Sequence, residues 1–166
     1  MKKLTRGDIE NLICDIAEKC YQKHVLEAGE FFDATLGPPK LLQTIADFED
    51  EIRRTLFDRN TRVLDFPGKM RQVYYNDFSN TLVILTPEDG KIGTCYRPYI
   101  DSQEDPAGPK PRLCTNFKRI EAEYEGITGK PPPPRRGGVF ELNPDMERGP
   151  APAKKLRNNV RNGNQS

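Results

Sequence analysis

The spacing of apolar residues changes near residue 60, and this change limits the folds that the chain can adopt. Before that point, apolar residues recur every three or four positions, which is the period of a helix with one buried face. After it, short segments rich in β-branched and aromatic residues alternate with turn-forming clusters, which is typical of β-strands. Helices followed by strands predict an α+β fold.

Two helices are predicted before the change. The first begins at a capping pair formed by Thr5 and Asp8, and it should end between His24 and Gly29. The second follows two adjacent prolines, which suit a helix start, and we place it at roughly residues 40–57. Both carry an apolar stripe that can face a sheet.

Four short strands are predicted after the change. The clusters between them contain only a few turn-forming residues, so consecutive strands should pair antiparallel. We therefore expect two N-terminal helices packed on a three- to four-stranded antiparallel sheet. The predicted strands are "RVLDF", "MRQVYY", "TLVILT" and "IGTCYRPY".

The character of the chain changes again after Tyr99. Residues 101–166 hold ten of the fifteen prolines and one helical pattern, "NFKRIEAEYEGI", which is brief and charged and is expected to bury little. We predict a compact domain at residues 1–100 and a largely irregular, Pro-rich tail at residues 101–166. The basic residues near its end could contact RNA or a partner, and a solvated terminus or linker explains them too.

The composition of the chain limits the kinds of binding site and metal site that it can form. The formal net charge is +1, so affinity for nucleic acid must come from a local concentration of lysine and arginine. The four cysteines form no CxxC pair, and the only histidine is too far from them in sequence to complete a zinc site. We expect reduced thiols, no metal and no cofactor. The sequence shows no signal peptide and no membrane span, which predicts a cytoplasmic protein.

The only histidine, His24, lies between lysines and glutamates at the predicted end of the first helix. It continues the inward-facing line of that helix, with Lys19 and Lys23 one turn apart beside it. One interpretation is structural, with the imidazole hydrogen-bonded to Glu27 or Glu30 at a helix C-terminus. The other is chemical, because an imidazole can transfer a proton near neutral pH.

The last predicted strand adds groups that suit phosphodiester cleavage. Alternation places Thr94 and Tyr96 on one face and Arg97 on the other. If the first helix crosses the sheet, the histidine, cations and hydroxyls could converge in one cleft, where the cations would stabilise a charged phosphorane. The same residues could equally be ordinary solvent-facing positions of a strand. Residues expected to contact RNA are Lys19, Lys69, Arg71, Tyr75 and Tyr96.

The chain resembles the toxin RNases of the BECR group, named for barnase, EndoU, the colicin tRNases and RelE. The resemblance rests on the order "KHV…GEF", a helix, then "VYYND…NTLVIL…GKIGTCYRP", and it covers about residues 8–100. It is strongest to the domains at the C-termini of contact-dependent inhibition and other polymorphic toxins, and in phages. The resemblance implies that His24 is the general acid or base, with Lys23 as its cationic neighbour. It also implies that Thr94 and Arg97 contact the phosphate.

One departure from the family matters for mechanism. The second histidine of many relatives is missing, so a two-histidine mechanism is excluded. The opposing proton carrier would be Glu27, Glu30, a lysine or a tyrosine, or the chain would be an inactive copy. The implied reaction is attack of an RNA 2′-hydroxyl on the adjacent phosphate, which leaves a 2′,3′-cyclic phosphate and needs no cofactor.

The resemblance also implies partners. By analogy the RNA would be a tRNA, and a cognate immunity protein, usually acidic, would cover the basic cleft. The competing hypothesis is a non-catalytic module that binds RNA or protein, suggested by the single histidine and the long polar tail. An immunity or antitoxin protein of the same systems is a third possibility, which the predicted basic cleft disfavours.

Overall fold

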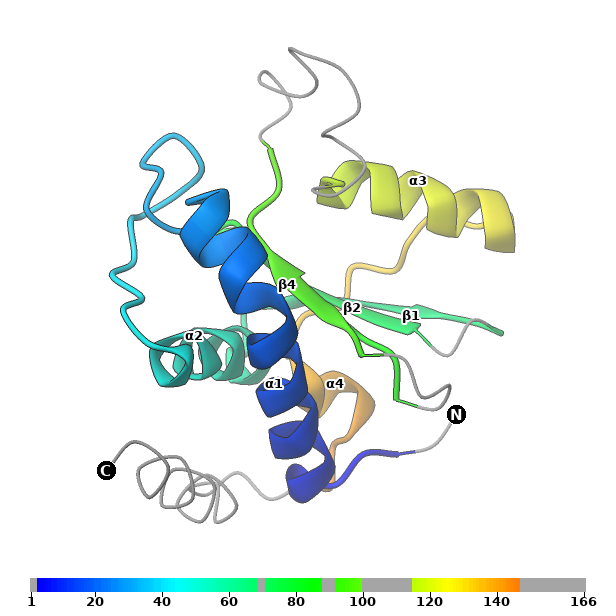
Figure 1. Cartoon of the computed structure of the whole chain (residues 1–166). Coiled ribbons are helices and arrows are strands. Elements are labelled where there is room, and N and C mark those ends of the chain that lie inside the picture. The colour runs from blue at the N-terminus through cyan, green and yellow to red at the C-terminus, as the bar shows by residue number, and fades with distance from the viewer. Residues whose placement is uncertain (1–2, 69–70, 88–91, 100–114, 147–166) are drawn as a thin grey trace.

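The computed structural model describes residues 3–68, 71–87, 92–99 and 115–146. Two helices of the N-terminal half lie against one face of an antiparallel sheet, and a third helix covers the other face (Figure 1). The elements are α1 (Arg6–Cys20), η1 (Tyr21–Glu27, a π-helix), α2 (Ile45–Phe57), β1 (Arg62–Phe66), β2 (Arg71–Asn76), β3 (Thr81–Leu85), β4 (Thr94–Tyr96), α3 (Phe117–Thr128) and α4 (Val139–Leu142).

Capping boxes set where both N-terminal helices begin. Thr5 and Asp8 exchange hydrogen bonds at the start of α1, as predicted, and the continuous helical segment ends inside the predicted interval. The second helix begins at Ile45, later than the predicted start at residue 40. Thr44 caps it together with Asp47, whose carboxylate accepts the two backbone N–H groups that precede the helix. This local capping stops the helix before it reaches the prolines.

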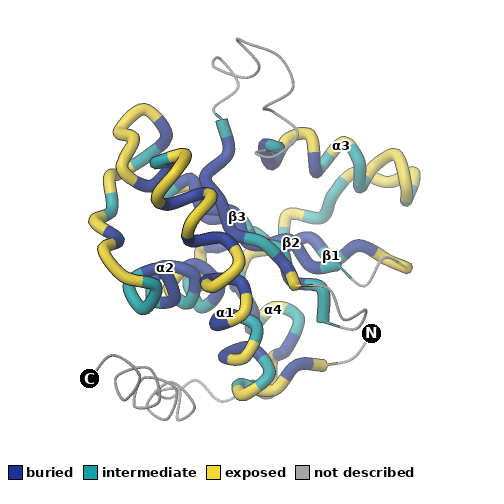
Figure 2. The backbone as a smooth tube through the Cα atoms, viewed as in Figure 1, coloured by how far each residue is buried: buried dark blue, intermediate teal, exposed yellow. Residues whose placement is uncertain are grey.

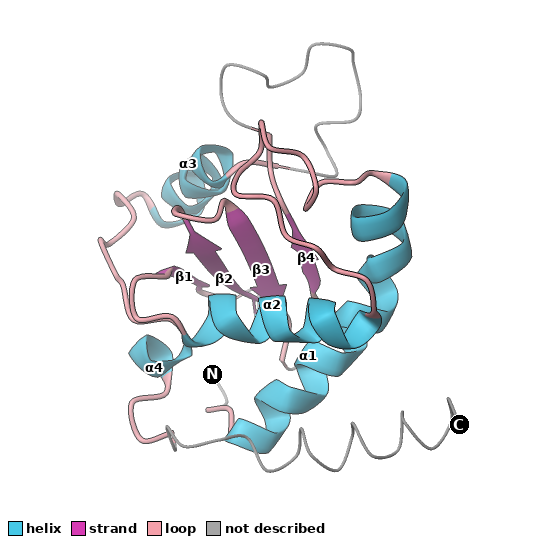
Figure 3. Ribbon diagram, turned by 90° about the vertical axis from the view of Figure 1, so that its left-hand side faces the viewer, coloured by secondary structure: helices cyan, strands magenta, loops and turns pink. Residues whose placement is uncertain are grey.

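The sheet confirms the predicted antiparallel meander, with strand order β1-β2-β3-β4. Alternation along each strand divides its side chains between two apolar clusters. Val83 and Cys95 face α1 and α2, whereas Leu82 and Tyr96 face α3. Figure 3 shows α2 crossing the strands on the side opposite α3, and Figure 2 shows buried residues gathered along the sheet and the inner helix faces.

The C-terminal part contributes more to this core than its charge suggested. The pattern "NFKRIEAEYEGI" forms α3 as predicted, yet Phe117 and Ile120 are each only 5% exposed against the sheet. Further along, Val139 of α4 is fully buried in the cluster beneath α1 and α2. Residues 115–146 therefore pack across the proposed division at residue 100, while the run 131–134 is irregular as expected. The basic C-terminal segment lies outside the described residues.

Two glutamates of α3 form ion pairs with arginines of the strands beneath the helix. Glu121 pairs with Arg62 at 2.8 Å and Glu123 pairs with Arg71 at 2.7 Å. A helix can thus be rich in charge and still bury its apolar side, because its carboxylates meet the cations of the strands beneath.

Among the described residues, no helix has both the length and the apolar character needed to cross a bilayer.

The packing of α3 can be tested with two isoleucines of that helix. Ile120→Ala should lower the free energy of unfolding by about 2–4 kcal/mol, because it empties a buried position against the sheet. Ile127→Ala is the control, because this side chain is 43% exposed, and it should change that free energy by less than about 0.5 kcal/mol. Urea denaturation followed by circular dichroism measures both. Equal losses in the two variants would contradict the described packing.

Candidate functional site at the end of the first helix

The imidazole of His24 is held by a buried carboxylate. Its Nδ1 lies 2.6 Å from Oε2 of Glu30, and the two side chains are 6% and 7% exposed. The chain turns between them at Gly29, whose φ of +63° lies in the left-handed region that glycine adopts without strain. The backbone N–H of Glu30 then donates to the carbonyl of His24 at 3.2 Å. The tight reversal brings the carboxylate back over the ring.

Glu30 also joins this helix end to the last strand. Its Oε1 accepts the backbone N–H of Arg97 at 2.9 Å, just beyond β4. One carboxylate therefore takes a hydrogen bond from a strand end with one oxygen and contacts an imidazole with the other. Three residues predicted to belong to the site, His24, Glu30 and Arg97, are brought together, although Arg97 enters through its main chain.

The ring of His24 rests on the last strand. It stacks on Tyr96, with ring centroids 5.7 Å apart and planes at 30°, and the phenol donates to the carbonyl of Thr115 at 2.7 Å. One turn earlier in the helix, the thiol of Cys20 lies 3.4 Å from the hydroxyl of Thr94. Among the described residues, Nε2 of His24 takes part in no hydrogen bond. A carboxylate on Nδ1 favours a proton there and leaves the lone pair on Nε2, so the ring can accept a proton.

The guanidinium of Arg97 packs against Phe31. The residue is fully buried, with Cζ 5.1 Å from the ring centroid of Phe31 and Nη1 3.5 Å from the carbonyl of the same residue. Burial lowers the pKa of Arg97, and the carboxylates of Glu51 and Glu30 oppose that shift. The expectation that imidazole and guanidinium open onto one cleft is not met. Alternation sends Tyr96 and Arg97 to opposite faces of the sheet, and His24 packs on Tyr96.

The charged residues near the end of the first helix differ in their exposure and in their partners. Lys19 donates to the carbonyls of Ile92 and Gly93, each at 3.0 Å, and so ties the helix to the chain that leads into β4. Lys23 and Glu27 are exposed, and Lys23 is the cation adjacent to the imidazole in sequence. Of the two predicted carboxylates, Glu30 contacts His24, whereas no hydrogen bond from Glu27 to the ring is formed among the described residues.

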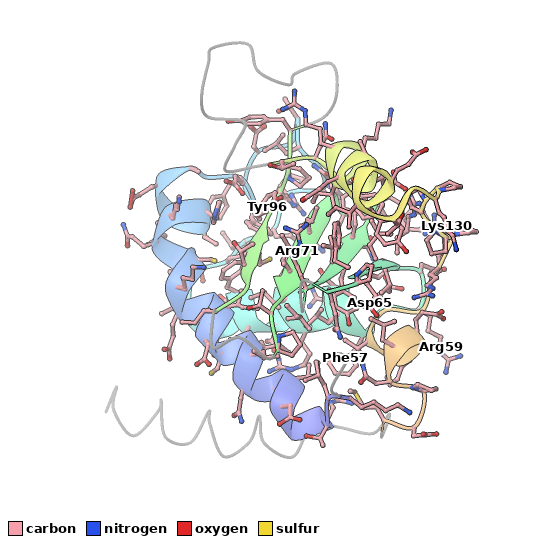
Figure 4. All side chains as sticks on the ribbon, turned by 90° about the vertical axis from the view of Figure 1, so that its right-hand side faces the viewer. Phe57, Arg59, Asp65, Arg71, Tyr96 and Lys130 are labelled. Atoms are coloured by element: carbon pink, nitrogen blue, oxygen red, sulfur yellow. The ribbon has the colours of Figure 1, made fainter. Side chains whose placement is uncertain are left out.

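The residues predicted to contact RNA from the middle strands are engaged with other groups. Arg71 pairs with Glu123 of α3, and the hydroxyl of Tyr75 donates to Asn80 at 2.7 Å. Figure 4 views this side of the molecule, with Arg71 and Tyr96 labelled. Lys69 lies outside the described residues. Only Tyr96 and Lys19 of the predicted RNA-binding set lie on the strand and helix that frame His24.

A cavity that the sequence patterns did not predict lies elsewhere in the molecule. It has a volume of about 240 Å³ and lies between α2 and the turn that joins β2 to β3. Its walls include Lys40, Arg54, Phe78 and Ser79. One signal was available, because the turn cluster "NDFSN" carries a phenylalanine where turns usually carry polar residues.

Among the described ranges, no group of three histidine, cysteine or acidic side chains is placed to hold a metal ion.

No protein-family model matches this chain, and neither does any curated protein or solved structure. The resemblance to the BECR group therefore rests on the quoted sequence motifs alone. Roles for His24 and its neighbours are proposals argued from their geometry.

Two glutamates three positions apart in the sequence, Glu27 and Glu30, test the central contact. Glu30→Gln should lower the free energy of unfolding by about 1–3 kcal/mol, because it removes a buried charge that satisfies two groups. Glu27→Gln, at an exposed position, should change it by less than about 0.5 kcal/mol. The single histidine adds a direct measurement, because its NMR signals should move in the first variant and stay in place in the second. Unmoved signals in Glu30→Gln would exclude the contact.

Proposed function

We propose that the protein is a metal-independent endoribonuclease in which His24 transfers the proton. The observation that supports this proposal is the contact of 2.6 Å between Nδ1 and the buried carboxylate of Glu30, with Nε2 left without a hydrogen bond among the described residues. A carboxylate behind an imidazole fixes the ring's orientation and stabilises the imidazolium that forms during proton transfer. Glu30 is thus a positioning residue.

In the proposed reaction, Nε2 of His24 takes the proton of an RNA 2′-hydroxyl. The 2′-oxygen forms a bond to the adjacent phosphorus, the bond from phosphorus to the 5′-oxygen breaks, and a 2′,3′-cyclic phosphate results. The departing 5′-oxygen takes a proton from the imidazolium or from water. Lys23, exposed beside His24 in the sequence, is the cation available to the phosphorane. Arg97 supports the site through its backbone N–H, which replaces the phosphate contact that the resemblance implied.

The proposal extends to substrate and partners only through the sequence resemblance. The RNA would be a tRNA in the cytoplasm, and an acidic immunity protein would block the site. The imidazole is 6% exposed, so the reaction requires the RNA to approach its open edge or the site to widen on binding.

Incubation of purified protein with total tRNA in EDTA tests the activity. The wild-type chain should cleave the RNA and leave 2′,3′-cyclic phosphate ends, and His24→Ala should lose at least about 100-fold in rate. Glu30→Gln should be slower than wild type at a temperature where it remains folded, and Glu27→Gln should match the wild type. Intact tRNA after incubation with wild-type protein would end the proposal, as would full activity in His24→Ala.

A non-catalytic module that binds RNA is the second candidate. The observation that favours it is burial, because Arg97 is fully enclosed and the imidazole is nearly so. Both side chains would then serve stability alone. This candidate requires RNA binding that weakens steeply as salt rises, without any product at long incubation.

A further inference from the structure

An exposed aromatic ring stands at the mouth of the cavity between α2 and the turn from β2 to β3. Phe78 is 75% exposed and lines the cavity. Its backbone is held in place, because Oδ1 of Asn76 accepts the N–H groups of Phe78 and Ser79, each at 3.1 Å. The turn therefore presents the ring to solvent on a main chain that these hydrogen bonds hold in place.

Two cations line the same cavity. Lys40 is half-buried, and among the described residues its ammonium forms no hydrogen bond or ion pair. Arg54 gives Nη1 to the carboxylate of Glu51 at 2.6 Å, and 61% of its side chain faces solvent, so its other nitrogens remain available. The acids of the cavity are engaged, since Glu51 takes that bond and Asp58 accepts from the amide of Asn76 at 2.8 Å.

A third cation lies behind the cavity wall. Gly37 lies close to both Ser79 and Arg97, because a Cβ at this position would be 2.7 Å from the carbonyl of Ser79 and 3.5 Å from Cζ of Arg97. The buried guanidinium is therefore next to the place where the segment around Gly37 contacts the turn at Ser79. Its Nε and Nη2 have no hydrogen-bond partner among the described residues. Pro38, which follows Gly37, also lines the cavity. A buried guanidinium with unsatisfied donors favours negative charge nearby.

We propose that this cavity binds one nucleotide of a single-stranded RNA. The base stacks on Phe78, and the phosphate is contacted by Lys40 and Arg54. An exposed ring beside solvent-facing cations is the combination that proteins use to bind single-stranded nucleic acids, because every base has a face for stacking and every nucleotide carries a charge. The choice of RNA as ligand rests on the proposed function, and the site would act as a substrate anchor separate from His24.

Fluorescence anisotropy with a short labelled 2′-O-methyl oligonucleotide tests the site, because this RNA lacks the attacking hydroxyl and cannot be cleaved. Phe78→Ala should weaken binding about tenfold. Phe78→Tyr keeps an aromatic face and should retain wild-type affinity. Lys40→Gln should weaken binding and reduce the slope of log affinity against log salt by about 0.7. Circular dichroism confirms that each variant is folded.

Two exposed residues outside the cavity provide matched controls. Phe32→Ala removes a ring that is 42% exposed, and Lys130→Gln removes an exposed cation, so both should bind as the wild type does. Wild-type affinity in the cavity variants, equal losses in the controls, or no binding by the wild-type chain would overturn the site. Cleavage of tRNA by a wild-type chain whose cavity variants bind normally would refute this inference and leave the proposal for His24 intact.

Discussion

The carboxylate of Glu30 is the group on which the arrangement of this molecule depends most. It receives a backbone N–H from the end of β4 and contacts the imidazole at the end of the first helix, so it joins the first and last elements of the N-terminal half. A buried carboxylate is tolerated only when its oxygens are satisfied. The position of His24 therefore depends on its contact with this carboxylate as well as on the helix that carries it.

Two neighbouring residues at the end of β4 point to opposite faces of the sheet. Tyr96 turns toward α3 and supports the ring of His24, while the next residue, Arg97, turns into the interior behind the cavity that Lys40 lines. His24, the proposed proton-transfer residue, and the cavity lined by Lys40 thus lie on either side of one strand. Because the overall charge is only +1, the proposed binding of RNA would depend on local placement of cations.

The C-terminal helix completes the domain. The side of the sheet that carries Leu82 and Tyr96 would face water without α3, which covers it with Phe117 and Ile120. The phenol of Tyr96 also donates to Thr115, directly before that helix, so the support beneath His24 extends past residue 100. Folding of the candidate site is thereby coupled to a segment that the sequence resemblance does not include.

Local patterns in the sequence determined the α+β class, the capping of the first helix, the antiparallel order of the strands and the inward direction of His24. These features depend on periods of two and 3.6 residues and on neighbours a few positions away. Only the tertiary structure decided that Glu30, and not Glu27, meets the imidazole, that Arg97 is enclosed, and that α3 covers a sheet face. The reason is physical: a local period assigns a residue to a face, whereas burial and partners depend on which distant segment packs there.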